Sequence, residues 1–181
     1  MSALETFFLA MVSHPEAQKK AQAEIDAVIG NDRLPNFDDE NSLPYVNAVV
    51  KEVLRWRPVV PLVPADLAGV PHRVISDDVY KGYHIPAGSI VIGNVRAMLH
   101  DELTFPEADK FKPERFLDTS IKFPEVAFGF GRRVCPGRYM ARGSIWIAIA
   151  SILATLDISK AVDKDGKLIE PTDEYSSGLI S

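Results

Sequence analysis

The sequence predicts a mainly α-helical protein with small β-sheets, and three observations lead to this fold class. Helical periodicity covers residues 15–29 and 44–56, a long apolar run fills 144–156, and short apolar runs broken by turn residues occupy 74–92. The 181 residues are 46% hydrophobic and 25% charged, which is ordinary for a globular domain and excludes intrinsic disorder. We therefore expect residues 1–181 to belong to one domain, with no separate second domain.

The first helix with clear boundaries is expected to follow Ser13. Ser13 and Glu16 have the spacing of a capping box, and Pro15 suits the first helical turn. The helix should reach Ile29, because Gly30 can adopt the left-handed conformation that commonly ends helices.

A second helix is expected from Pro44 to Trp56, where Arg57 precedes a proline and so avoids the helical region. The pattern then changes to short apolar runs separated by turn residues, which indicates strands. These strands are expected at residues 74–75, 83–85 and 89–92.

Towards the C-terminus, residues 128–137 form a glycine-rich loop that leads into a long apolar helix at 138–156. Its apolar run is shorter than the roughly 20 residues that a membrane span needs, so we expect a buried core helix. No basic segment opens residues 1–12, so no signal peptide is predicted. A turn is expected at Asp165-Gly166.

Charge and cysteine content narrow the functional classes. Lys and Arg number 20 against 25 Asp and Glu, a formal net charge of −5, which argues against nucleic-acid binding. The one cysteine, Cys135, cannot form an intramolecular disulfide, so we expect an intracellular protein.

Cys135 is the main candidate for chemistry. It stands just ahead of the long helix beside Arg132, Arg133 and Arg138, an environment that favours a thiolate, which is either a nucleophile or a metal ligand. The simpler alternative is a small buried hydrophobic residue. A thiol-dependent enzyme would need a nearby base, and every histidine is remote in the chain. A phosphate-binding loop would need Lys and then Ser or Thr after its second glycine, which are absent.

Residues 128–137 (FGFGRRVCPG) match F-x-x-G-x-R-x-C-x-G at every fixed position, and this resembles the haem-binding signature of the cytochrome P-450 family. Other segments are similar to further family motifs, in the style of eukaryotic microsomal and fungal members. They are E-x-x-R at residues 52–55, P-H-R at 71–73, G-Y-x-I-P-x-G at 82–88 and F-x-P-E-R-F at 111–116.

The resemblance implies the C-terminal part of the cytochrome P-450 fold, incomplete at both ends, with haem b held by the thiolate of Cys135 as axial iron ligand. It also implies roles for other residues around the haem. Phe128 would limit solvent beside the ligand, Gly131 and Gly137 would allow the loop conformation and the approach to the macrocycle, and Arg133 and His72 would pair with haem propionates.

In the same pattern, Glu52 and Arg55 pair with Arg115 and hold their helix to the region that presents the cysteine. An E-x-x-R alone is weak, because such a pair on a helix is commonly solvated. A buried set is costly to break, so loss of Glu52 or Arg55 should prevent folding around haem.

The activity implied is monooxygenation, in which one atom of O2 enters a small lipophilic organic substrate. Electrons would come from an NADPH-cytochrome reductase-type donor, which would dock at a basic surface containing Arg132, Arg138 and Arg142. These arginines are equally well explained as solvated helix charges. The family is usually anchored to the endoplasmic reticulum by an N-terminal helix.

Three departures from the family pattern affect this prediction. Residues 2–11 resemble the end of the long distal helix, whose proton-delivery residues are absent, so no catalytic residue is assigned. About six surplus residues lie near 63–68, in a segment that normally passes over the haem. Residues 176–179 resemble the start of a final substrate-facing turn, without its closing strand. The alternative is a non-catalytic haem-binding remnant.

Overall fold

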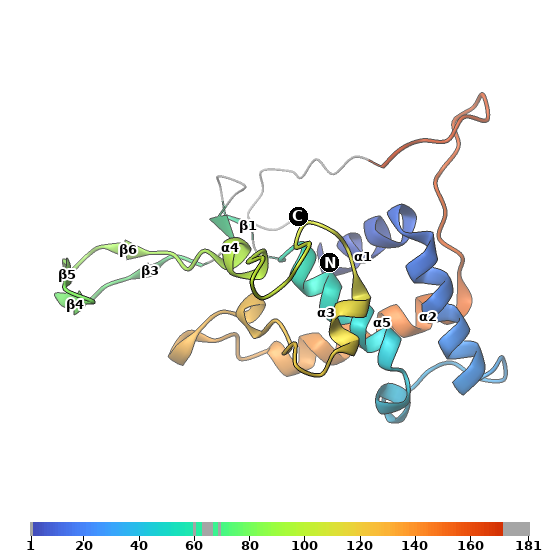
Figure 1. The fold of residues 1–181 in the computed structure, drawn as a ribbon, viewed down its shortest axis with the longest axis horizontal. Coiled ribbons are helices and arrows are strands. Elements are labelled where there is room, and N and C mark those ends of the chain that lie inside the picture. Colours follow the sequence, from blue (N-terminus) through green and yellow to red (C-terminus); the bar gives the residue numbers. More distant parts are fainter. Residues whose placement is uncertain (1, 60, 63–66, 69, 172–181) are drawn as a thin grey trace.

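The computed structural model describes residues 2–59, 61–62, 67–68 and 70–171. Helices form most of the body, and a long β-hairpin extends from it (Figure 1). The α-helices are α1 (Ser2–Ser13), α2 (Pro15–Val28), α3 (Pro44–Trp56), α4 (Val95–Leu99) and α5 (Arg138–Thr155). Short 3-10 helices are η1 (Phe37–Ser42), η2 (Pro113–Leu117), η3 (Glu125–Phe128) and η4 (Gly131–Arg133). The mainly helical fold class is confirmed.

The junction between α1 and α2 differs from the sequence prediction. Ser13 is the last residue of α1 rather than an N-cap, because the chain is already helical there and the His14 amide donates to the Ala10 carbonyl at 2.8 Å. His14 takes the N-cap position of α2 without a side-chain hydrogen bond. The expected helix itself is present and ends before Gly30, which has φ +72°.

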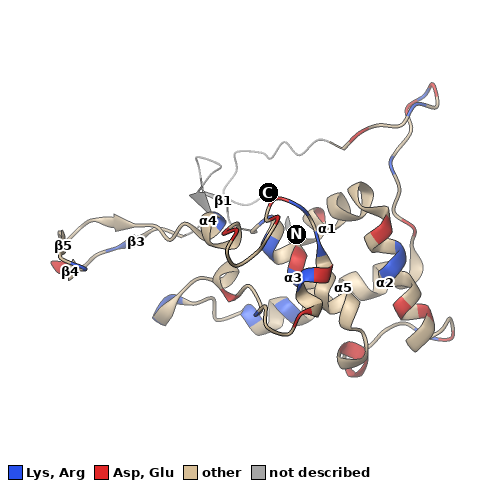
Figure 2. Cartoon of the chain, viewed as in Figure 1, with Lys and Arg blue, Asp and Glu red and all other residues tan. Residues whose placement is uncertain are grey.

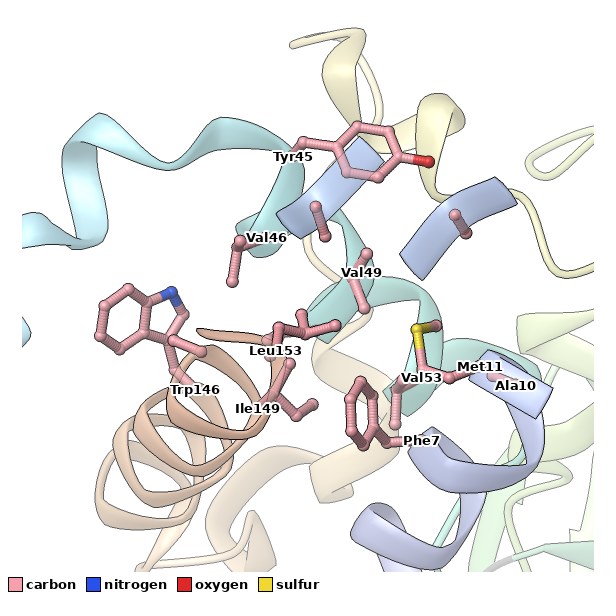
Figure 3. Packing of buried hydrophobic residues seen from close by; sticks show 14 of the residues in the cluster. Phe7, Ala10, Met11, Tyr45, Val46, Val49, Val53, Trp146, Ile149 and Leu153 are labelled. Atoms are coloured by element: carbon pink, nitrogen blue, oxygen red, sulfur yellow. The ribbon is translucent and has the colours of Figure 1, made fainter. Parts of the chain in front are cut away.

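The main hydrophobic core lies where α1, α2, α3 and α5 meet (Figure 3). Phe7 of α1, Val53 of α3 and Ile149 of α5 are fully buried there. Trp146 adds the largest side chain, and its indole nitrogen donates to Asn47 Oδ1 at 2.6 Å. The predicted core helix at 138–156 is therefore confirmed as α5, one residue shorter at its C-terminal end.

Two contacts from α2 reach segments distant in sequence. The Glu24 carboxylate accepts hydrogen bonds from the amides of Tyr45 and Val46 at 2.8–2.9 Å, so it caps the N-terminus of α3. The Gln18 side-chain amide exchanges two hydrogen bonds with the backbone of Ile158, at 3.0 and 2.9 Å, and ties the segment after α5 to α2.

The described strands form three two-stranded antiparallel sheets. Their pairs are β1 (Pro61–Leu62) with β2 (Leu67–Ala68), β3 (His72–Arg73) with β6 (Ile90–Val91), and β4 (Asp78–Tyr80) with β5 (Tyr83–Ile85). The expected strands at 83–85 and 89–92 are present. The one expected at 74–75 lies two residues earlier, although Val74 still donates to the Ser89 carbonyl at 2.9 Å.

A second hydrophobic cluster joins α4 to the segment before α5. It buries Val95, Leu99, Phe105 and Phe116 and is extended by the half-buried residues Val126 and Ala127. The predicted turn at Asp165-Gly166 is also present, with Gly166 at φ +79°. Within the described residues no helix has the length and apolar character to cross a membrane. The predictions for residues 63–66 and 176–179 lie outside the described residues.

Candidate functional site

The loop that carries Cys135 (residues 129–137) runs from the end of η3 to the start of α5. The Cys135 amide donates to the Phe128 carbonyl at 2.8 Å, which closes the loop at its base. Gly129 and Gly131 have φ values of +86° and +54°, a region that residues with a Cβ rarely adopt. Glycine at these positions therefore sets the path of the backbone towards the cysteine.

Cys135 and Phe128 are both half-buried. The Phe128 ring stacks on Phe123, with centroids 6.2 Å apart and an interplanar angle of 14°. Phe123 is covered in turn by the guanidinium of Arg142, 3.9 Å from the ring centroid. Phe128 thus joins the base of the loop to α5 through a stacked aromatic pair.

Basic residues lie along the cysteine loop and the start of α5 (Figure 2), and the four arginines there differ in their contacts. Arg132 and Arg133 are exposed, and within the described residues their side chains have no ion pair or hydrogen bond. Arg138 donates to the Cys135 carbonyl at 3.3 Å and lies over the Tyr139 ring, while Arg142 pairs with Glu125 at 3.5 Å. The first two keep their charge available to a ligand or partner.

Gly137 is the N-cap of α5 with φ −85°, so its backbone does not require glycine. A Cβ there would lie 3.9 Å from Cys135 Sγ, an ordinary contact. Nothing within the described chain therefore explains a glycine at this position.

His72 lies on β3, where it pairs with Val91, and its side chain is exposed. Among the described residues no hydrogen bond or ion pair connects it to the cysteine loop. Among the described residues, the structure therefore shows no polar contact between His72 and the other predicted site residues.

Glu52, Arg55 and Arg115 form a buried ion-pair cluster at the junction of α3 and η2. Arg55 Nε lies 2.7 Å from Glu52 Oε2, and Arg115 Nε lies 3.2 Å from Glu52 Oε1. The side chains of Glu52 and Arg55 are 0% exposed and that of Arg115 is 3% exposed. This burial distinguishes the cluster from the solvated helix pair that an E-x-x-R spacing usually produces.

Backbone groups that the sequence analysis missed complete the cluster. The Lys112 amide donates to Glu52 at 2.8 Å, Arg55 donates to the Leu99 carbonyl at 2.8 Å, and Arg115 donates to the Pro106 carbonyl at 2.7 Å. Every buried side-chain nitrogen or oxygen in the described residues has a partner. No sequence signal marks these groups, because every residue carries a carbonyl and only the fold selects which ones face a guanidinium.

The buried ionic cluster and the glycine loop that carries Cys135 are the features by which the sequence resembles the haem proteins of the cytochrome P450 family. The family model described as Cytochrome P450 matches residues 1–179, and the chain belongs to this family. Members of the family are haem proteins that use O2, an organic substrate and a redox partner.

Among its relatives, the chain is 53% identical over 186 residues to cytochrome P450 monooxygenase claR of Ampulloclitocybe clavipes, an alignment that covers 100% of this chain. It is 54% identical to cytochrome P450 monooxygenase ple1 of Rhodocybe pseudopiperita and 54% identical to cytochrome P450 monooxygenase 208 of Postia placenta, over 99% and 100% of this chain. The chain spans about a third of the length of these relatives, 34–35%.

The donor set fits a haem iron. Within the described residues no group of three His, Cys, Asp or Glu side chains is placed to hold a metal ion, so Cys135 is an isolated soft donor. A haem brings four ring nitrogens of its own and needs only an axial protein ligand, which a single half-buried cysteine can provide.

Proposed function

We propose that residues 1–181 are the C-terminal, haem-binding portion of one cytochrome P450 monooxygenase domain, with the Cys135 thiolate as the axial ligand of haem b. The observation that carries this proposal is the loop itself. A single half-buried cysteine stands at the N-terminal end of α5, in a loop closed by its own amide and containing two exposed arginines that have no ion pair with any described residue.

Bound haem would supply dioxygen activation and the insertion of one oxygen atom into an organic substrate. The chain's contribution would be the Cys135 thiolate, which would hold the iron and, by donating electron density, would favour O–O cleavage. Cys135 would thus both bind the iron and set its reactivity.

The residues around Cys135 would bind and shield the group. Phe128, held by its stacking on Phe123, would exclude water from one side of the sulfur. Arg133, exposed and unpaired within the described residues, would neutralise a propionate. Gly137 would leave room for the macrocycle beside the start of α5. This would explain the glycine at a position where no contact within the described chain requires one. His72 would bind a propionate only if the hairpin lies beside the haem.

The whole protein would take electrons from an NADPH-cytochrome reductase-type donor. Arg132 and Arg138 offer positive charge near the loop, whereas Arg142 is already engaged by Glu125 and Phe123 and would contribute less. The substrate would be a small lipophilic molecule. The full-length protein would be intracellular, at the endoplasmic reticulum membrane.

The decisive experiment reconstitutes the purified chain with haem, reduces it and adds carbon monoxide. The expected result is the red-shifted Soret band of a thiolate-ligated haem, absent in Cys135→Ala. A Cys135→Ala chain that keeps this band would overturn the ligand assignment. A folded wild-type chain without the band would contradict haem binding by this polypeptide, whereas a band without turnover of any substrate would favour the non-catalytic haem-binding remnant.

The propionate role has its own matched pair of variants. Arg133→Ala should weaken haem binding in a titration more than Arg132→Ala, because both arginines are exposed and unpaired and differ only in the proposed contact. Equal weakening would remove Arg133 from the site.

A further inference from the structure

We infer that Gly93 is a positioning residue for Cys135, acting through a contact with Phe130 that holds the cysteine loop against the segment before α4. The importance of this contact for haem ligation rests on the function proposed above, whereas its effect on the cysteine does not.

Any side chain at position 93 would force the Phe130 ring, which is 42% exposed, to move away. A Cβ built on Gly93 would lie 2.6 Å from Phe130 Cε2 and 3.4 Å from Cδ2 and Cζ. A carbon at 2.6 Å is well inside the 3.5–4.0 Å at which carbon atoms attract one another. Gly93 does not have the positive φ of the loop glycines, so it is the position of the Phe130 ring, and not backbone conformation, that a side chain here would disturb.

Phe130 is well placed to control the loop. It lies between Gly129 and Gly131, the two left-handed glycines that set the path of the backbone. No side chain from residue 129 to residue 137 is fully buried, so packing contributes little else to hold this segment. The Phe130 carbonyl also accepts the Arg133 amide at 3.2 Å, inside the turn that leads to Cys135.

The Gly93 side of the contact is rigid. Its carbonyl accepts the Val95 amide at 2.9 Å, and the neighbouring Asn94 side chain caps α4 by accepting the Ala97 amide at 2.9 Å. The other end of α4 is fixed by the Leu99 carbonyl, which accepts Arg55 Nη1 at 2.8 Å. A continuous set of contacts therefore runs from the buried ionic cluster through α4 and Gly93 to Phe130.

The test uses the fact that Cys135 is the only cysteine, so alkylation by iodoacetamide reports on this loop alone. Gly93→Ala displaces the Phe130 ring, and Phe130→Ala removes it. Each should raise the alkylation rate of the folded chain at least about threefold through easier local opening. The double variant should react no faster than Phe130→Ala, because the added methyl group no longer meets a ring.

Gly143→Ala is the matched control, because a Cβ there meets Phe37 Cε1 at 3.6 Å, an ordinary contact, and it should leave the rate unchanged. Circular dichroism confirms that each variant is folded. If Gly93→Ala were to misfold, Phe130→Ala alone would still have to raise the rate. A wild-type rate in either folded single variant, or additive effects in the double variant, would overturn the inference.

Haem reconstitution of the same proteins separates the two proposals. If the wild-type chain binds haem, Gly93→Ala should lower the share of the thiolate-type carbon monoxide spectrum, and Gly143→Ala should not. A wild-type chain that fails to bind haem would contradict the proposed function and leave the alkylation result as the measure of the Gly93 contact.

Discussion

The helical core and the cysteine loop are held by different forces. In the core, Phe7, Val53 and Ile149 are completely buried, and even the charged Glu52 and Arg55 are inaccessible and fully paired. In the loop, no side chain from residue 129 to residue 137 is fully buried, and glycine conformations and a few backbone hydrogen bonds define the path. Stability thus depends mainly on the core, and substitutions in the loop should change the proposed chemistry with little loss of stability.

The largest effect is expected from Glu52→Gln, which leaves Arg55 and Arg115 as buried charges without their counter-ion. Breaking a buried ion pair costs about 3–5 kcal/mol, a large fraction of a typical domain's stability. Urea unfolding measures the change. Glu107→Gln is the control, since Glu107 pairs with Lys110 and Lys112 at the surface. Similar losses in both variants would contradict the contrast between core and surface.

A smaller effect is expected from Glu24→Ala, which removes the carboxylate that accepts the amides of Tyr45 and Val46. Loss of a capping side chain costs about 1 kcal/mol. Glu16→Ala is the control, because the Glu16 side chain is 65% exposed, lies 3.4 Å from His14 Nδ1 and accepts no amide of α3. Equal thermal midpoints for the two variants would show that the cap contributes nothing.

A pH-dependent effect is expected from His100, at the end of α4 between the two regions. Burial lowers its pKa from the ordinary value, although a hydrogen bond with the Arg96 carbonyl opposes the shift. As the pH falls below the ordinary value of 6.5, the unfolded chain gains a proton before the folded chain does, so the free energy of unfolding decreases. Below the lowered pKa of His100 in the folded chain, both states are protonated, and the free energy of unfolding decreases no further. His100→Gln should reduce this dependence in urea titrations between pH 7.5 and pH 5, and an unchanged slope would contradict it.

The smallest effect on stability is expected from Cys135→Ala. Its side chain is only half-buried, so the free energy of unfolding without haem should change by less than about 1 kcal/mol. Ile149→Ala in α5 removes a fully buried side chain and should cost about 2–5 kcal/mol. A loss at Cys135 as large as that at Ile149 would mean that the loop also supports the core.

Local signals in the sequence predicted the helices well. Pro44 and Pro58 bracket α3, and the apolar run beyond residue 143 located α5, because helix boundaries and burial depend on nearby residues. The position of a strand also depends on the neighbouring strand with which it pairs, and the local sequence does not specify that strand. The strand β4 was missed for this reason, although it pairs with β5 around the Lys81-Gly82 turn, where both residues have positive φ.

Residues of the site that belong to a sequence motif could be predicted. Residues that meet only because the fold brings distant segments together could not. The cluster of Glu52, Arg55 and Arg115 was expected from the resemblance to the family, because the E-x-x-R spacing alone is weak, and the loop motif indicated Cys135. The Leu99 carbonyl and the contact of Gly93 with Phe130 join segments distant in the sequence, and no local pattern records them. Ser13 was wrongly predicted as a cap because α1 continues through it.

The paired hydrogen bonds of Gln18 with Ile158 have a consequence for biosynthesis. These residues are separated by 140 positions. At about 5–20 residues per second, translation of the intervening segment takes on the order of ten seconds. During that interval the apolar faces of α1 and α3 have been made but lack α5, which completes their packing. The nascent chain therefore exposes these apolar faces until α5 has been synthesised.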